Sequence, residues 1–209
     1  MVSTLSFSSP LDSIATLERG IVTLVYGPPA VGKTNVCLCA LRSAGNSIYI
    51  DTEGGFSPLR AQQLKLDLDK ILYKRVSDFH EQQKLLAKLD LGCDLLVVDS
   101  LVMLYRLELR DNPDKVNALL AKQLSALSSY ADKMNAAVLV TGQVYRDFGT
   151  KEVQIAGGDV LKYWPKTIIE LSHDGRKKRA ALQKHRSLPP AEVSFVISAD
   201  GLGRPGLLS

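Results

Sequence analysis

Runs of apolar, β-branched residues recur along the chain, with segments of helical spacing between them. The runs occupy residues 21–26, 47–51, 71–76, 94–99 and 137–141. Nearly continuous apolar runs of this length are typical of parallel strands that are buried on both faces of a sheet. The pattern therefore predicts an α/β fold with a mostly parallel sheet flanked by helices.

Two of the intervening segments carry helix-start signals. Asp78 is followed three residues later by Glu81, which is the pattern of a capping box. Asn112 precedes Pro113, and proline is well suited to the first position of a helix. We therefore expect helices to begin after Asp78 and after Asn112.

The C-terminal part of the chain follows a different pattern. Strand-like segments at 166–171 and 177–184 flank Asp174-Gly175, and Asp-Gly is a strong signal for a hairpin turn. Alternating apolar residues from Val193 to Ile197 indicate one more strand. The sequence thus predicts a C-terminal β-hairpin beside the parallel sheet.

Composition limits the class of protein. A chain of 209 residues without an internal repeat or a linker suits one sizeable domain. We expect a short lead-in over residues 1–20 and one domain over residues 21–209. We see no secretory leader and no apolar run of membrane-spanning length, so we expect a cytoplasmic protein without a membrane partner. The net charge of +4 permits an anionic partner but does not require one.

A glycine-rich motif follows the first apolar run and precedes a predicted helix. It reads Gly27, Pro28, Pro29, Ala30, Val31, Gly32, Lys33 and Thr34. In this strand–loop–helix context, backbone N–H groups and the helix N-terminus cradle phosphates. Lys33 would reach the β- and γ-phosphates of ATP, and the Thr34 hydroxyl would hold Mg²⁺. The sequence therefore predicts an ATP site.

Carboxylates end two of the predicted strands. Asp99 follows four apolar residues, which is the Walker B pattern, and would hold Mg²⁺ together with Thr34. Asp51-Thr52-Glu53 ends another strand and would place a carboxylate beside the γ-phosphate, where it can orient the attacking water. We favour Glu53 for that role. For Asp51 and Thr52, capping at a strand end explains the residues as well as function does.

Together these segments resemble the RecA-fold recombinases of the archaeal and eukaryotic RadA type. The resemblance runs over nearly the whole chain. Its motifs are Gly27–Thr34, Asp51–Arg60, Leu96–Arg106, Thr141–Gln143, Gly157–Asp159 and Ala199–Gly203.

The resemblance implies a RecA-type P-loop NTPase core that uses ATP and Mg²⁺. It implies that Glu53 is the water-activating base, and that Lys33 and Gln143 belong to the same catalytic centre. Gln143 would couple the γ-phosphate to a DNA-binding loop. Arg60 would stack on the adenine.

The sequence also departs from the pattern of that family. Only about twenty residues precede the first predicted strand, so we do not expect the helical N-terminal DNA-binding domain of that family. None of the five phenylalanines is followed three residues later by alanine, so the Phe-x-x-Ala polymerisation motif is absent. Gly142 replaces the sensor asparagine, and the loop from Arg146 to Ala156 is short. We therefore expect a homodimer or short oligomer rather than a long filament.

Basic residues mark two candidate contacts with DNA. One set lies in the loops where RecA-like proteins bind single-stranded DNA: Arg106, Arg110, Arg146 and Lys151. Tyr145 and Phe148 could stack on bases there. The other set follows the Asp-Gly turn: Arg176, Lys177, Lys178 and Arg179. These cations could contact phosphates without reading base sequence, although cations on an edge strand also protect a sheet from aggregation.

Lys184 and Arg186 end the predicted hairpin. In ring-forming RecA relatives, similar Lys-x-Arg pairs reach the γ-phosphate bound by a neighbouring subunit, so these two residues are candidates for a role in trans. An ordinary charged strand end explains them too. The three histidines, His80, His173 and His185, share no metal-ligand spacing, so we expect no metal beyond Mg²⁺.

The sequence favours a weakly hydrolysing ATPase that binds DNA, preferably single-stranded and without sequence specificity, and that assists homologous recombination and repair. One alternative is a regulatory module, switched by ATP, that acts through a RadA-type recombinase or another repair protein with negligible turnover. A metabolic P-loop kinase is the other alternative. It has less support, because kinases need a substrate-binding lid and the Asp-Thr-Glu and Thr-x-Gln units suit hydrolysis better.

Overall fold

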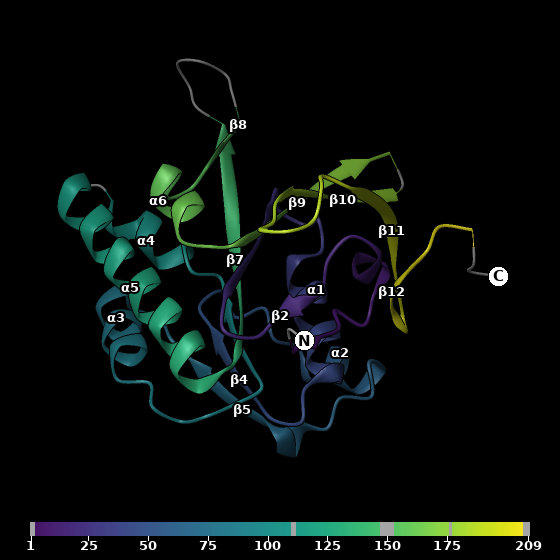
Figure 1. Ribbon diagram of the computed structural model, residues 1–209, viewed down its shortest axis with the longest axis horizontal. Coiled ribbons are helices and arrows are strands. Elements are labelled where there is room, and N and C mark those ends of the chain that lie inside the picture. Colours follow the sequence, from purple (N-terminus) through teal and green to yellow (C-terminus); the bar gives the residue numbers. More distant parts are fainter. Residues whose placement is uncertain (1–2, 110–111, 147–152, 176, 207–209) are drawn as a thin grey trace.

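The computed structural model describes residues 3–109, 112–146, 153–175 and 177–206. Within them a central sheet has the strand order β12-β11-β10-β9-β3-β7-β6-β4-β5, and β8 pairs with β7 (Figure 1). The parallel strands are β9 (Thr167–Asp174), β3 (Val22–Gly27), β7 (Ala137–Arg146), β6 (Leu95–Asp99), β4 (Ser47–Asp51) and β5 (Ile71–Arg75). The antiparallel strands are β8 (Val153–Ile155), β10 (Lys177–Lys184), β11 (Glu192–Ser198) and β12 (Gly201–Gly203).

Helices cover both faces of this sheet (Figure 1). One face carries α1 (Lys33–Ala40) and α2 (Pro58–Gln63). The other carries α3 (Phe79–Ala87), α4 (Met103–Glu108), α5 (Pro113–Met134) and α6 (Gly158–Tyr163). Short 3₁₀ helices are η1 (Pro10–Ser13), η2 (Leu41–Ser43) and η3 (Leu68–Lys70). The predicted α/β fold with a mostly parallel, helix-flanked sheet is confirmed.

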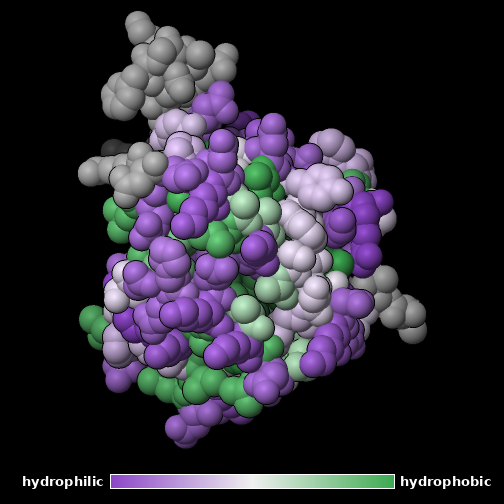
Figure 2. Space-filling view, turned by 90° about the vertical axis from the view of Figure 1, so that its left-hand side faces the viewer, coloured by the Kyte–Doolittle hydropathy of each residue, from purple (hydrophilic) through white to green (hydrophobic). Residues whose placement is uncertain are grey.

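The apolar strand residues divide into two cores. Along β6, Leu96 and Val98 pack on the side of α3 and α5, whereas Leu95 and Val97 pack on the side of α1. Successive side chains of a strand point to opposite faces, so a continuous apolar run supplies both cores. The outer surface of α3 and α5 carries mainly hydrophilic side chains (Figure 2).

Several expected boundaries are confirmed. The Asp78 carboxylate accepts the backbone N–H of Glu81 at 2.8 Å and begins α3. Asn112 accepts from the N–H of Lys115 at 3.1 Å and begins α5. The hairpin of β9 and β10 is present, with Asp174 paired to Lys177 and Gly175 in the left-handed region at φ 58°.

Other expectations are corrected. Strand β5 is at the sheet edge, so Leu72 is 53% exposed, and the expectation of burial on both faces is wrong for residues 71–76. The segment expected as a loop from Arg146 to Ala156 contains β8, which pairs with an extended β7. Residues 3–20 form β1 (Thr4–Leu5), η1 and β2 (Leu17–Glu18), and Phe7 is fully buried in the core beside α1.

No helix in the part of the chain that the structure describes is long and apolar enough to cross a membrane.

Candidate nucleotide-binding site

The carboxyl ends of the central parallel strands meet at one edge of the sheet. In register, Asp51 of β4 lies opposite Asp99 of β6, and Gly27 of β3 lies opposite Gln143 of β7. Ligands of open α/β sheets bind outside this edge. The topology therefore brings the predicted site residues together from four separate segments of the chain.

The glycine-rich loop lies between β3 and α1, and residues of the C-terminal strands β9 and β11 pack against it. A Cβ atom on Gly27 would lie 2.3 Å from the carbonyl oxygen of Leu171 in β9. Gly32 has φ 106°, and a Cβ there would lie 2.9 Å from Cδ1 of Ile197 in β11. Only glycine fits these two positions. Beside the loop is a cavity of about 260 Å³ that Lys33, Thr34, Glu53 and Asp99 line.

Lys33 is directed back toward its own loop. Its Nζ donates to the carbonyl oxygens of Gly27 and Pro28, each at 2.9 Å. Burial lowers the pKa of Lys33, while the carboxylates of Glu53 and Asp99 act in the opposite direction. An ammonium held by two backbone carbonyls in a glycine cradle fits a phosphate group, which would offer stronger, charged acceptors.

Asp99 is surrounded by hydroxyl groups. Its Oδ2 accepts from Thr34 Oγ1 at 2.7 Å and from the Tyr49 hydroxyl at 2.9 Å, and its Oδ1 accepts from Thr141 Oγ1 at 2.6 Å. Burial raises the pKa of Asp99, and these hydrogen bonds act against that rise. Thr34 and Asp99, each expected from the sequence to hold Mg²⁺, are hydrogen-bonded to one another, and their role as metal ligands stays a prediction. A hydroxyl and a carboxylate are the hard oxygen donors that Mg²⁺ prefers, so the residues fit that ion.

Asp51 serves a different purpose from Asp99. Its Oδ1 accepts the backbone N–H groups of Glu53, Gly54 and Gly55, and its Oδ2 accepts that of Phe56. The Arg75 guanidinium also donates to Oδ1 at 3.1 Å. Asp51 thus folds the loop that presents Glu53. Thr52 is likewise structural, because its hydroxyl donates to the Ser100 carbonyl at 2.7 Å and accepts the Ser100 N–H at 2.9 Å.

A chain of hydrogen bonds leads from Glu53 to α4. Gln143 Nε2 donates to Glu53 Oε1 at 2.6 Å, and Arg106 donates to Gln143 Oε1 at 2.7 Å. We call these three residues the relay. The sequence assigned Arg106 to DNA contact alone, and its bond to Gln143 was missed because the two residues lie 37 positions apart.

The guanidinium group of Arg60 is held in place by three hydrogen bonds. It donates to Asn35 Oδ1 at 2.8 Å, to Gln63 Oε1 at 2.9 Å and to the Ala199 carbonyl at 2.8 Å. These in-plane bonds join α2 to α1 and to the turn after β11. They hold the planar group in one orientation, as a stacking role requires, and the adenine contact stays a prediction.

The basic residues that were expected to contact DNA differ in their structural environment. Arg110, Lys151 and Arg176, as well as Phe148, lie outside the described residues, and Arg146 is placed only as the last residue of β7. Lys177 and Lys178 lie on β10, while Arg179 pairs with Glu192 at 3.2 Å. One of the expected hairpin cations is thus already neutralised within the chain.

Lys184 and Arg186 both have partners within the chain. Lys184 Nζ donates to the carbonyls of Lys162 and Tyr163 at the end of α6, at 3.1 and 3.3 Å. Arg186 pairs with Glu18 of β2, its Nε donating to Glu18 Oε2 at 2.8 Å. A role in trans would require each residue to release these partners, and it stays a prediction.

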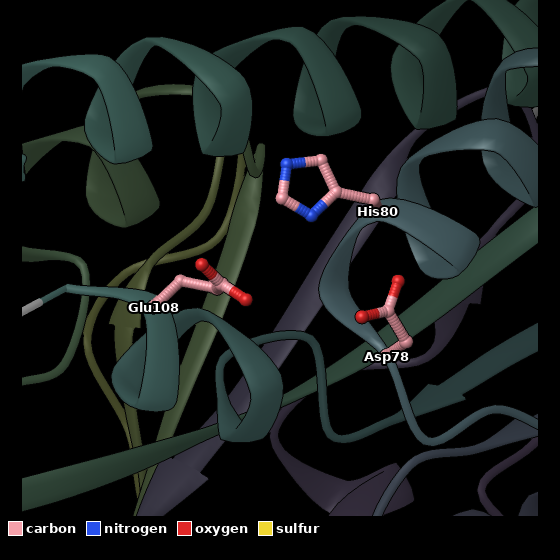
Figure 3. A group of neighbouring side chains, drawn as sticks. All are labelled: Asp78, His80 and Glu108. Carbon is pink, nitrogen blue, oxygen red and sulfur yellow. The ribbon is translucent and has the colours of Figure 1, made fainter. Parts of the chain in front are cut away.

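One further group of polar side chains was not predicted. Asp78 and His80, at the start of α3, and Glu108, at the end of α4, turn toward one another (Figure 3). One ligand atom from each lies within 4.8 Å of the others. Spacing rules applied to the histidines could not find this group, because Glu108 comes from another helix. Asp78 and His80 are exposed and Glu108 is half-buried, and Asp78 is already accounted for as the N-cap of α3.

Comparisons with known proteins agree with this geometry. The family model described as Rad51 matches residues 2–205. The DNA repair and recombination protein RadB of Methanocaldococcus jannaschii is 37% identical over 204 residues, which cover 90% of this chain and 95% of that protein. The protein of the same name from Methanococcus maripaludis strain C7 is 39% identical over 201 residues, which cover 89% and 93%.

A solved structure shows the same likeness. The crystal structure of the RadB recombinase matches with a TM-score of 0.80 at 33% identity and covers 96% of this chain and 99% of that one. The likeness in sequence and in fold therefore extends over nearly the whole chain. The chain belongs to the Rad51 family, which has the RecA-type P-loop ATPase fold.

Proposed function

We propose that this protein binds ATP with Mg²⁺, hydrolyses it slowly, and uses the bound nucleotide as a switch for binding DNA in homologous recombination and repair. The relay carries the proposal, because it joins the carboxylate suited to activate water, Glu53, to Arg106 on a candidate DNA-binding element. The names of the RadB relatives support the same role.

The loop residues would bind the phosphates of the substrate. Lys33 would exchange the carbonyls of Gly27 and Pro28 for phosphate oxygens. The N-terminus of α1 adds its partial positive charge at the same place. Because the glycine cradle is already formed by contacts with β9 and β11, these residues need little rearrangement to do so.

Thr34 and Asp99 would hold the metal ion. When bound, Mg²⁺ supplies positive charge that offsets the negative charge developing on the phosphates. Thr34 would ligate through Oγ1, and Asp99 would act directly or through water. Tyr49 and Thr141 keep the Asp99 carboxylate in one orientation for this purpose.

Glu53 would act as the general base. Gln143 holds Oε1, which leaves Oε2 to accept the proton of the attacking water. The hydrogen bond from Gln143 also restricts how the Glu53 carboxylate can turn toward the attacking water, so slow turnover is expected. The same bond favours the second candidate function, a regulatory ATP-switched module with negligible turnover that acts through a RadA-type recombinase or another repair protein.

DNA would be bound without reading its base sequence. The candidate contacts are those of the two basic sets, of which Arg106, Lys177, Lys178 and Arg179 have described side chains. We also propose a homodimer or short oligomer in which Lys184 and Arg186 act in trans. Light scattering across a range of protein concentrations tests this, and a mass that stays monomeric excludes it.

Two substitutions test the catalytic assignment. Lys33→Ala should weaken ATP binding by about 2–3 kcal/mol, because a charge-assisted contact is lost. Glu53→Gln should preserve ATP binding and abolish turnover. Nucleotide affinity and phosphate release are measured for both variants, with and without single-stranded DNA.

The outcomes separate the two functions. A Glu53→Gln protein that hydrolyses ATP at the wild-type rate removes Glu53 from the mechanism. Turnover that stays negligible in the wild type even with single-stranded DNA, combined with tight ATP binding, selects the regulatory module.

A further inference from the structure

Asp78, His80 and Glu108 form a cluster of side chains that the proposed function does not use. Asp78 directly precedes α3, His80 is the second residue of that helix, and Glu108 is the last residue of α4. The His80 ring and the two carboxylates face a common space between the helices (Figure 3). One ligand atom from each residue lies within 4.8 Å of the others. Ligand-type atoms from two separate helices therefore converge on one point, which we call the α3–α4 cluster.

A buried aromatic contact holds the two helices in this arrangement. Phe79, which lies between Asp78 and His80, packs edge-on against Tyr105 of α4, with the ring centroids 6.3 Å apart. Phe79 and Tyr105 are 1% and 4% exposed. The backbone that carries the α3–α4 cluster is thus fixed by the core of the protein. Only side chains would have to move to receive a ligand, as a preorganised site requires.

The charge of the α3–α4 cluster favours a cation. Among the residues that the structure describes, the ion pairs include neither Asp78 nor Glu108. Glu81, the next acid along α3, is in contrast paired with Lys74 at 3.6 Å. Two negative charges that face one space repel each other, and a cation between them would remove that repulsion.

The residue types indicate which cation fits. Mg²⁺ and Ca²⁺ prefer oxygen ligands throughout, whereas Zn²⁺ accepts an imidazole nitrogen together with carboxylate oxygens. In a tetrahedral zinc site with bonds of about 2.0–2.2 Å, the ligand atoms lie about 3.4 Å apart. Side-chain rotation can close the remaining gap, because Asp78 and His80 are exposed and Glu108 is half-buried.

We propose that the α3–α4 cluster binds one Zn²⁺ ion, which fastens the start of α3 to the end of α4. Each of the three side chains would supply one ligand atom, and water would complete the coordination. Asp78 can bind the ion while it caps α3, because Oδ1 accepts the Glu81 N–H and a carboxylate has a second oxygen. The expectation of no metal beyond Mg²⁺ rested on spacing between histidines, and this site uses only one.

The test is a calorimetric Zn²⁺ titration of untagged protein without nucleotide. Excess Mg²⁺ is present throughout to occupy the oxygen ligands of Thr34 and Asp99. The wild type should bind one ion per chain. Asp78→Asn, His80→Ala and Glu108→Gln should each weaken binding by about 100-fold or more, since even the hydrogen-bond partners of metal ligands contribute roughly 10–100-fold.

Asp78→Asn is the most informative of the three variants. Asparagine caps a helix about as well as aspartate does, so the fold and the start of α3 should be preserved. Loss of Zn²⁺ binding in this variant therefore reports on the ligand and not on the helix.

Zn²⁺ should also stabilise the folded wild type, because an ion that binds the folded state raises the melting temperature. Thermal melts with and without Zn²⁺ measure this rise, which should disappear in the three variants. Hydrogen exchange should show that Zn²⁺ increases the protection of backbone amides in α3 and α4.

Two controls match the substituted residue types. Glu81→Gln removes an exposed carboxylate from the same helix, and His173→Ala removes an exposed imidazole from β9. Neither substitution should change the affinity for Zn²⁺.

Other results overturn the inference. Zn²⁺ binding that is unchanged in all three variants places the ion elsewhere. Binding of several ions per chain, or equal weakening by the two controls, shows an adventitious ion only. Binding that depends on the α3–α4 cluster without raising the melting temperature removes the fastening of the two helices. A wild type that does not bind Zn²⁺ rejects the site and leaves the proposed binding of ATP and DNA untouched.

Discussion

Two buried aspartates lie side by side in this protein, and their carboxylates accept hydrogen bonds from different kinds of donor. Asp51 and Asp99 are paired in register on adjacent strands and are 1% and 2% exposed. Asp51 is matched by four backbone N–H groups and by the Arg75 guanidinium. Asp99 is matched by three neutral hydroxyl groups. Within the described residues, Asp51 forms an ion pair with a cation of its own chain, and Asp99 does not.

The difference is the one expected between an acid that holds the structure together and an acid that holds a metal ion. A buried charge is tolerated when it is paired and hydrogen-bonded, and Asp51 meets both conditions. Asp99 meets only the second, and burial raises its pKa. Its charged form becomes favourable when a cation binds beside it, as expected of a residue that holds a metal ion.

Substitution of Asp51 should have the largest effect on the free energy of unfolding. Asp51→Asn removes a charge that faces Arg75 and leaves buried N–H groups with a poorer acceptor. We expect a loss of about 3–5 kcal/mol in the free energy of unfolding, measured by urea denaturation. The exposed Asp69→Asn serves as the control and should stay within about 0.5 kcal/mol of the wild type. If Asp51→Asn lowers the free energy of unfolding by no more than the control does, Asp51 has no special structural role and the contrast with Asp99 fails.

Substituting Asp99 should impair the chemistry without lowering the stability of the fold. Asp99→Asn should lower Mg²⁺-dependent turnover by about 100-fold or more. Because the folded pKa of Asp99 is raised, stability is lost as pH rises through that pKa, and the wild type carries this loss at pH 7.

The neutral amide introduced by Asp99→Asn does not titrate and has no such loss, so this variant should melt at a higher temperature than the wild type at pH 7. The advantage should shrink as pH falls through the folded pKa toward the ordinary value of about 4. Thermal melts across this range, without nucleotide, measure it. A variant that melts below the wild type at pH 7 would contradict the comparison.

The smallest effect should come from a matched pair of hydroxyl deletions. Tyr49→Phe removes one donor from Asp99, and Tyr73→Phe removes one from Asp51. Each should cost about 1 kcal/mol of stability or less. Only Tyr49→Phe should also weaken Mg²⁺-dependent nucleotide binding, by a few-fold. If both variants weaken it equally, the division between the two acids fails.

Local signals made much of the site predictable. The glycine loop and Thr34 were found because strand, loop and helix are contiguous in the sequence, and Asp99 was found because it ends a run of four apolar residues. The role of Asp51 stayed undecided, because its partners Tyr73 and Arg75 come from a strand more than twenty residues further on. Tyr49 gave no signal, since a tyrosine inside an apolar run suits a core. Such contacts depend on strand order, which the sequence pattern leaves open.

The fold was predictable to a similar degree. Continuous apolar runs predicted the central strands, because burial on both faces leaves a clear pattern, and the Asp174-Gly175 turn signal predicted the hairpin. The same pattern could not show that β5 is an edge strand. An edge strand differs from a central strand in the number of strands beside it, and its residue composition can be the same. Strand β8 was missed because three residues are too few to establish an alternation.

The packing of β9 and β11 against the glycine loop has a consequence during synthesis of the chain. The loop itself is complete by Thr34, but its walls include Leu171 and Ile197, which the ribosome adds late. A nascent chain therefore carries the phosphate-binding motif long before the strands that pack against that motif have been made. Because a ligand stabilises only the state that binds it, ATP in the cell can stabilise finished chains and leaves truncated ones without that protection.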